Sequence, residues 1–198
     1  EVYYLAGLTS VGLSFEQPVE CMESISLGTL NFLEAIKLNQ KKIKFFNAGS
    51  SECFGNTNKI IANEKTVFSP RSPYATAKAT AFWIVSNYRE SYNLFCCTGI
   101  LGNHESPLRN KRFVTKKIVS GVWDIVCKKS NELRLGNLDT WRDWGWAPEY
   151  VEAMYLIMHA PEPEDYIIAT GVTNSLKDFV SMAFKKFNLD ESKFVTCD

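Results

Sequence analysis

Tyr74 and Lys78 are the residues of this sequence whose types and spacing most plainly indicate chemistry. They stand four residues apart, directly after Pro73, in a pattern that predicts a helix, so both side chains share one face. An ammonium group beside a phenol favours the phenolate, and we expect it to lower the pKa of Tyr74 from its usual value of about 10. Tyr74 is therefore a candidate general base supported by Lys78. An amphipathic helix can show the same spacing by chance, so other residues have to decide.

A second pair of polar residues follows a predicted buried strand at residues 43–48. Gly49, Ser50, Ser51 and Glu52 come directly after that strand. Parallel sheets place their reactive groups at the carboxyl ends of strands. There the Ser50 hydroxyl could hydrogen-bond a substrate oxygen, and the Glu52 carboxylate could take a carbon-bound proton made acidic by a neighbouring ketone. A turn-capping serine and a solvated glutamate are the ordinary alternatives for each residue alone.

The elements that would position these residues alternate along the chain. Apolar runs predict strands at residues 2–5, 43–48, 95–101, 133–135 and 166–169. Helical spacing predicts helices at about residues 18–39, 72–92, 114–127, 149–159 and 175–187. Strands that alternate with helices predict an α/β fold whose parallel sheet is covered by helices on both faces.

Composition and charge argue against several classes of function. The chain has 198 residues, and its 22 basic and 22 acidic side chains balance, so neither nucleic acid nor an anionic membrane is an expected partner. No signal peptide and no bilayer-length apolar run is present in the sequence, so we expect a cytoplasmic protein. The six cysteines lack zinc-binding spacing, so we expect no metal site and reduced thiols that pack as small apolar groups.

Ser50, Glu52, Tyr74 and Lys78 together resemble the catalytic set of the extended short-chain dehydrogenases/reductases. Longer strings narrow the resemblance to the GDP-mannose 4,6-dehydratase family, above all Asn103-His104-Glu105-Ser106-Pro107 and Arg142-Asp143-Trp144-Gly145. Residues 14–18, 70–74, 113–115 and 168–171 add to it, and the similarity runs from residue 2 to about residue 187. The resemblance implies a Rossmann-like doubly wound parallel sheet, with residues 1–102 as the remainder of the NAD(P)-binding domain. Residues 103–198 would form a mixed segment with returning strands and helices and part of a smaller substrate-binding region.

The resemblance implies a lyase that converts GDP-mannose to GDP-4-keto-6-deoxymannose, with NADP, or else NAD, reduced and reoxidised in one cycle. Tyr74, supported by Lys78, would take the proton of the sugar 4-hydroxyl, and Ser50 would hydrogen-bond the 4-oxygen. Glu52 would take the C5 proton and assist departure of the 6-hydroxyl as water. The family usually has threonine where this chain has Ser50, and we expect serine to retain the chemistry.

The resemblance also implies binding residues. Besides Tyr74 and Lys78, the residues that match cofactor-contacting positions are Leu5, Ala6, Gly7, Leu8, Thr9, His104 and Arg109. Those that match substrate-contacting positions are Asn103, Lys117 and Arg142, the last as the arginine that grips the diphosphate. For Trp141, Trp144 and Trp146 we expect core or subunit packing rather than guanine stacking.

Departures from the family pattern leave alternatives open. No glycine-rich GxxGxxG turn occurs in the sequence, so we expect a fragment that lacks the cofactor-binding start of the family. Leu8, Ser10 and Trp146 also differ from the family pattern. One alternative is a dehydratase or epimerase for another nucleotide sugar, and Glu52 favours a dehydratase. Another is an inactive truncated relative that acts as a binding or assembly partner. The family implies a homo-oligomer, a dimer or tetramer, formed through helices near Glu20 and Ser72.

Overall fold

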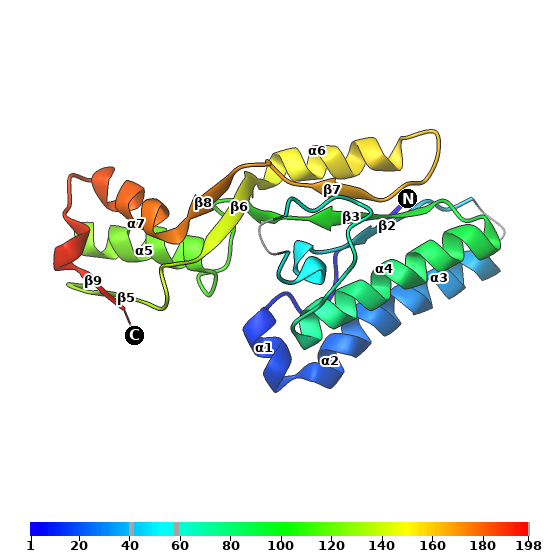
Figure 1. The fold of residues 1–198 in the computed structure, drawn as a ribbon, viewed down its shortest axis with the longest axis horizontal. Helices are drawn as coiled ribbons and strands as arrows, with labels where there is room; N and C mark the ends of the chain where they lie inside the picture. Colours follow the sequence, from blue (N-terminus) through cyan, green and yellow to red (C-terminus); the bar gives the residue numbers. More distant parts are fainter. Residues whose placement is uncertain (40–41, 58–59, 198) are drawn as a thin grey trace. The chain divides into compact units, whose positions relative to one another are not determined.

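The computed structural model describes residues 1–39, 42–57 and 60–197, and these divide into two compact units (Figure 1). Unit 1 comprises Glu1–Gly102 and Pro148–Ile168. Unit 2 comprises Asn103–Ala147 and Ala169–Asp198, of which Asp198 lies outside the described residues. The chain therefore leaves unit 1 after Gly102, returns to it for one helix and one strand, and leaves it again.

A four-stranded parallel sheet forms the centre of unit 1. Its strands are β1 (Val2–Tyr4), β2 (Phe45–Ala48), β3 (Cys96–Leu101) and β7 (Tyr166–Ile168), hydrogen-bonded in the order β1-β2-β3-β7. In the register of the two central strands, Phe45 pairs with Cys96 and Phe46 with Cys97. The strands predicted in these regions are confirmed.

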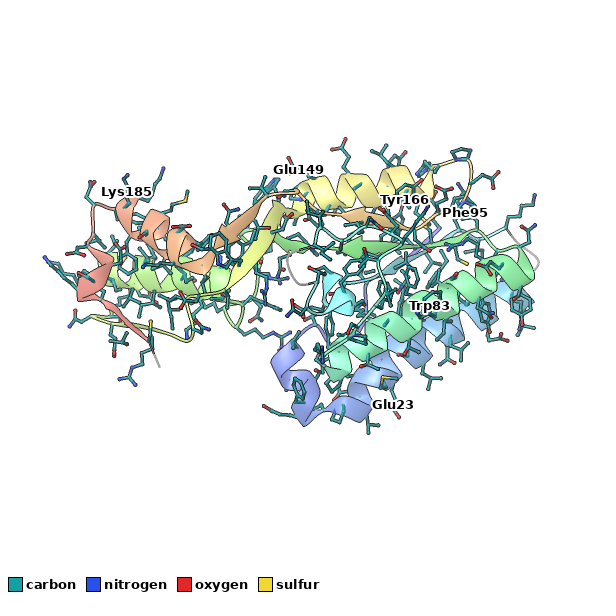
Figure 2. The ribbon with its side chains drawn as sticks, viewed as in Figure 1. Glu23, Trp83, Phe95, Glu149, Tyr166 and Lys185 are labelled. Atoms are coloured by element: carbon teal, nitrogen blue, oxygen red, sulfur yellow. The ribbon has the colours of Figure 1, made fainter. Side chains whose placement is uncertain are left out.

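Helices cover both faces of this sheet. Helix α6 (Ala147–Met158) lies on one face, and α3 (Gly28–Leu38) and α4 (Pro73–Tyr92) lie on the other (Figure 1). Because side chains alternate along a strand, Phe46 and Cys97 pack among α6 residues, whereas Phe45 and Cys96 pack among residues of α3 and α4. Side chains fill both layers (Figure 2). The predicted parallel α/β sheet is confirmed, and burial on both faces explains why its strands are continuous apolar runs.

The long helix predicted after Pro18 consists of three consecutive pieces. Helix α2 (Pro18–Met22) passes into a π-helical turn (Glu23–Leu27) and then into α3, and α1 (Val11–Glu16), which the sequence analysis does not predict, precedes them. Pro18 stands at the first position of α2, where a missing N–H has no cost. The Tyr4 hydroxyl donates to Ser24 O at 2.6 Å, which ties the π-helical turn to β1.

Unit 2 has its own core and two small sheets. Strands β4 (Asn103–Glu105), β6 (Trp141–Trp146) and β8 (Thr173–Ser175) form one sheet in the order β4-β6-β8, in which β4 is parallel and β8 antiparallel to β6. Strands β5 (Leu133–Leu135) and β9 (Val195–Cys197) form the other. Helices α5 (Val114–Val126) and α7 (Leu176–Lys185) bury Ile118, Val122, Val180 and Phe184 between them and β5.

Three features bear on the class of function. No helix of residues 1–39, 42–57 and 60–197 is both long and apolar enough to cross a membrane. Within the same ranges, no group of three or more His, Cys, Asp or Glu side chains is placed to hold a metal ion. All six cysteines are free thiols, and Cys21, Cys53, Cys96 and Cys97 are buried.

Candidate active site

Two serine N-caps, one on a 3-10 turn and one on α4, position the predicted catalytic residues of unit 1. Ser50 follows β2, and its Oγ accepts from Glu52 N at 3.3 Å, which caps a 3-10 turn at Ser51–Phe54. Ser72 Oγ accepts from Ala75 N at 3.0 Å and caps α4, whose first residue is Pro73. Glu52 and Tyr74 are therefore held at the beginnings of two different helical segments.

Direct contacts join the end of β2 to α4. Lys78 Nζ, in the second turn of α4, donates to Ala48 O in β2 at 2.7 Å, and the side chains of Ser50 and Tyr74 are hydrogen-bonded. Lys78 Nζ lies 5.8 Å from the centroid of the Tyr74 ring. The charge of Glu52 also acts on the Tyr74 phenol. The structure thus brings together all four residues for which the sequence predicts catalytic roles.

Burial governs the protonation of Tyr74 and Lys78. Burial raises the pKa of the Tyr74 phenol to about 12, although the hydrogen bond with Ser50 lowers it. Burial lowers the pKa of the Lys78 amine to about 8, because a charge is costly away from water. The predicted lowering of the Tyr74 pKa by Lys78 is therefore wrong for this structure. The reason is that Lys78 Nζ is directed to Ala48 O and desolvation of the phenol outweighs the opposing effects.

The loop after β1 lies beside the same group. Residues 5–9 leave the carboxyl end of β1, which is adjacent and parallel to β2. Leu8 packs in one apolar cluster with Tyr74, and its N–H donates to Ser24 Oγ at 3.4 Å. Gly7 has φ +113°, and a Cβ there would lie 2.6 Å from Ile25 Cγ1, so only glycine fits. The predicted cofactor-binding loop thus follows the strand next to β2, after which Ser50 lies; its residues are Leu5, Ala6, Gly7, Leu8 and Thr9.

The other predicted binding residues belong to unit 2. Asn103 and His104 lie on β4 and Arg142 on the adjacent β6, where Asn103 pairs with Trp144 and His104 with Gly145. The Arg142 side chain is exposed, and its Nη1 donates to the main-chain carbonyl of the preceding residue at 2.8 Å. One small sheet therefore carries three of the predicted residues.

Arg109 and Lys117 lie beyond β4. Arg109 Nε is 3.3 Å from Glu105 Oε2, and its guanidinium carbon is 3.6 Å from the centroid of the Phe113 ring. Lys117 lies in the first half of α5. The expected packing of tryptophans holds for Trp144, whose ring centroid is 5.5 Å from that of Phe179. Trp141 and Trp146 are exposed, so core packing is wrong for them and subunit packing stays a prediction.

The sequence analysis missed Asp143 as an organising residue. Its carboxylate accepts hydrogen bonds from Thr170 N at 3.1 Å, Thr170 Oγ1 at 2.6 Å and Gly171 N at 2.8 Å. These bonds fix the turn that leads into β8, next to the strand that carries Arg142. Two of the family-like strings, 142–145 and 168–171, contain the residues of this contact, and their joint presence could have indicated it.

Comparison with known proteins decides the family. The model of the family described as GDP-mannose 4,6 dehydratase matches residues 1–196. The chain belongs to the GDP-mannose 4,6-dehydratase family. It is 48% identical to GDP-mannose 4,6 dehydratase of Drosophila melanogaster, over 93% of this chain and 47% of that protein. It is 47% identical to GDP-mannose 4,6-dehydratase of Sinorhizobium fredii, over 94% of this chain and 54% of that protein. The chain spans about half the length of these curated relatives.

Solved structures show the same fold at lower identity. RMD from Pseudomonas aeruginosa, complexed with NADPH, superposes with a TM-score of 0.92 at 21% identity, over all of this chain and 67% of that one. DesIV, a dTDP-glucose 4,6-dehydratase from Streptomyces venezuelae with NAD and TYD bound, gives 0.87 at 18% identity, over 98% and 59%. The predicted membership of the GDP-mannose 4,6-dehydratase family and the predicted fold are both confirmed.

Proposed function

We propose that this chain takes part in converting GDP-mannose to GDP-4-keto-6-deoxymannose, as a lyase that uses NADP, with NAD as the alternative. The observation that carries the proposal is the meeting of Ser50, Glu52, Tyr74 and Lys78 where β2 ends and α4 begins. The reaction requires two proton transfers, one at the sugar 4-oxygen and one at C5 beside the ketone. The side chains gathered here supply the groups for both, a hydroxyl, a carboxylate, a phenol and an amine. Membership of the dehydratase family supports it.

The donors present suit a nicotinamide nucleotide. Lys78 donates one hydrogen bond to a protein acceptor among the described residues, which leaves two of its three N–H donors for a hydroxyl-bearing group such as a ribose. Tyr74, Lys78 and the loop at residues 5–9 would hold that part of the cofactor. His104 and Arg109 are proposed as further cofactor-binding residues because they match family positions. When bound, the oxidised nicotinamide would accept and return a hydride, and its positive charge would lower the pKa of a neighbouring phenol.

The chain's own residues would then move protons. Tyr74 accepts the proton of the sugar 4-hydroxyl, and Ser50 hydrogen-bonds the 4-oxygen as its charge changes. The 4-ketone acidifies C5, so that Glu52 can take the C5 proton and pass it to the 6-hydroxyl, which departs as water. Asn103, Lys117 and Arg142 would bind the substrate, with the planar Arg142 guanidinium on the diphosphate.

We also propose that the protein is a homo-oligomer, a dimer or tetramer, formed through the helical layer of α3 and α4. An open apolar pocket of about 300 Å³ lies where α2 and the π-helical turn lead into this layer. Its lining residues are Met22, Glu23, Ser26 and Leu27, together with Leu30 of α3 and Ile84 of α4. Val19, Leu27 and Trp83 nearby are exposed large apolar side chains, and Glu23 and Trp83 mark the layer in Figure 2. Four buried free thiols support a reducing compartment, the cytoplasm.

The test is an assay of this chain with GDP-mannose and NADP, followed by mass spectrometry of the sugar nucleotide. It is run on the chain as printed and on the chain joined behind a GxxGxxG strand-helix segment of a family relative. We expect loss of one water to give the 4-keto-6-deoxy sugar in the extended form. If the extended form binds NADPH, seen by its fluorescence, but leaves GDP-mannose unchanged, the proposal fails. Turnover of another nucleotide sugar would then identify a different dehydratase or epimerase, and no turnover at all a binding role.

A further inference from the structure

The short turn that carries Glu52 is held by a second segment of unit 1. The 3-10 turn at Ser51–Phe54 is a single turn, which is too short to be stable by itself. The chain returns to it at Ser69, whose N–H donates to Cys53 O at 2.9 Å. At Gly55 a Cβ would lie 2.1 Å from Ser69 O, so the two segments meet with no room for a side chain. The position of Glu52 therefore depends on how this returning segment is held.

The ring of Phe68 joins the returning segment to both the turn and α4. Its centroid lies 5.3 Å from that of Phe54, the last residue of the turn, and 4.8 Å from that of Phe82 on α4, both edge to face. Edge-to-face pairs of this kind stabilise a structure by more than the burial of their apolar area alone. Trp83, labelled on α4 in Figure 2, is 6.3 Å away. Phe68 thus bridges the element that carries Glu52 and the helix that carries Tyr74.

We propose that Phe68 is a positioning residue that sets the distance between the Glu52 carboxylate and the Tyr74 phenol. The proposal rests on the proposed function and deepens it. A further link between the same elements, from Cys53 Sγ to Ala75 O at 3.7 Å, is weak because a thiol is a poor donor. Without the Phe68 ring, the turn keeps its Ser50 cap but loses its aromatic support on α4.

The two proton transfers depend on Phe68 unequally. Tyr74 and Lys78 both belong to α4, and Lys78 stays anchored at Ala48 O, so the first step keeps its geometry. In that step the 4-hydroxyl proton passes to Tyr74 and the C4 hydride to NADP, giving the ketone and NADPH. The second step, in which Glu52 takes the C5 proton and passes it to the 6-hydroxyl so that water leaves, loses its geometry. A misplacement of about 1 Å costs on the order of 10²-fold in rate.

The kinetic test uses Phe68→Ala in the protein form that turns over GDP-mannose. We expect kcat to fall on the order of 10²-fold while NADPH and the 4-keto hexose accumulate in a single turnover. The matched control is Phe187→Ala, which removes a ring that packs at a tilt against Trp123 in unit 2 with centroids 5.9 Å apart, and it should leave both steps unchanged. Equal slowing of both steps, or no slowing, would overturn the role of Phe68 and leave the dehydratase intact. Failure of the unaltered protein to make any keto sugar would instead refute the proposed function, and this inference with it.

A second readout needs no turnover. Cys53 is 1% exposed beneath the returning segment, and Cys96 is 0% exposed in β3. In Phe68→Ala, we expect iodoacetamide to alkylate Cys53 at least about tenfold faster, because the turn opens locally, while Cys96 keeps its rate. Alkylation of both thiols at the same increased rate would mean general unfolding, and an unchanged Cys53 rate would mean that Phe68 does not hold the turn. Either result would contradict the proposal.

Discussion

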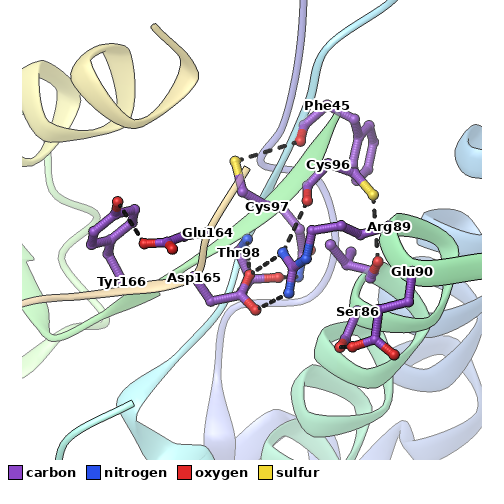
Figure 3. Close-up of polar contacts among 12 residues, drawn as sticks. Phe45, Ser86, Arg89, Glu90, Cys96, Cys97, Thr98, Glu164, Asp165 and Tyr166 are labelled. Atoms are coloured by element: carbon purple, nitrogen blue, oxygen red, sulfur yellow. Dashed lines mark hydrogen bonds and ion pairs between the residues drawn. The ribbon is translucent and has the colours of Figure 1, made fainter. Parts of the chain in front are cut away.

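Helix α4 carries two cations away from open solvent, the partly buried Arg89 and the buried Lys78, and their surroundings are opposite. Arg89 meets a carboxylate: its Nη1 and Nη2 donate to Asp165 at 2.9 and 2.5 Å, and Nη1 also donates to Cys96 O at 3.0 Å (Figure 3). Asp165 accepts a further bond from Thr98 N at 2.7 Å. Lys78, three turns earlier on the same helix, has a carbonyl oxygen as its acceptor, and its pKa falls to about 8.

The difference distinguishes Arg89, which stabilises the fold, from Lys78, which belongs to the candidate active site. The hydrogen bonds that Asp165 accepts raise the pKa of Arg89 above its ordinary value, so Arg89 stays charged. The pair joins α4, β3 and the segment before β7. Lys78 costs stability where it is, because burial opposes its charge. A buried cation without a carboxylate, next to a partly buried phenol, is typical of a functional site rather than of a structural ion pair.

The largest change in the free energy of unfolding should come from breaking the Arg89–Asp165 pair. Asp165→Asn leaves the partly buried Arg89 guanidinium with no opposite charge. Removing one partner of a fully buried pair costs about 3–5 kcal/mol, so for side chains that are 18% and 11% exposed we expect about 3 kcal/mol. We expect this loss in the free energy of unfolding, measured by urea denaturation. It would be a large share of the total stability of a domain.

A surface pair provides the control for that change. Glu132 and Arg134 are 3.0 Å apart, with side chains 41% and 69% exposed. Glu132→Gln should therefore cost far less than Asp165→Asn, since water already screens the pair. Equal losses in the two variants would show that the Arg89 pair is no more than a surface contact.

Removing the Lys78 amine should instead raise the free energy of unfolding. Unfolded, Lys78 titrates at its ordinary pKa of 10.5, and folded it titrates at about 8. Below pH 8 both states are charged and the folded chain bears the full desolvation cost, whereas above pH 10.5 both are neutral and the cost is absent. Lys78→Met should therefore raise the free energy of unfolding at pH 7 by on the order of 3 kcal/mol, and the gain should shrink as pH rises from 8 to 10.5. Turnover should be lost.

Lys44 is the matched control for Lys78. Its Nζ also donates to a main-chain carbonyl, Met158 O, at 2.7 Å, but the side chain is only half-buried. Urea titrations of Lys44→Met across the same pH range should show no comparable gain. If Lys78→Met is instead destabilising at pH 7 by as much as Lys44→Met, the Lys78 amine serves the fold and the comparison with Arg89 collapses.

This contrast marks the limit of what the sequence can predict. The meeting of Ser50, Glu52, Tyr74 and Lys78 follows from local signals, because strand ends and a proline-started helix are recognisable along the chain. The Arg89–Asp165 pair joins residues 76 positions apart, and no spacing rule connects them. The pKa of Tyr74 depends on how many atoms exclude water around it, which is a tertiary property, so the sequence gives the wrong sign. Strands β4, β6 and β8 were missed because their polar and half-exposed residues carry no apolar alternation.

The smallest effect is expected at Ser50, the neutral residue that hydrogen-bonds the Tyr74 phenol. The side-chain hydrogen bond with Ser50 lowers the pKa of the Tyr74 phenol, as the hydrogen bonds of Asp165 stabilise the charge of Arg89, but without a charge of its own. Ser50→Ala should therefore raise that pKa further, shift the rise of kcat/KM to higher pH, and lower turnover about tenfold, as expected for one hydrogen bond to a charged group. Ser50→Thr keeps the hydroxyl and should retain the activity and its pH profile. If the Ser50→Ala enzyme keeps the unaltered pH profile, Ser50 only caps the turn that carries Glu52. The reason is that, of the two bonds that Ser50 makes, only the bond to the Tyr74 phenol affects the titration of that phenol.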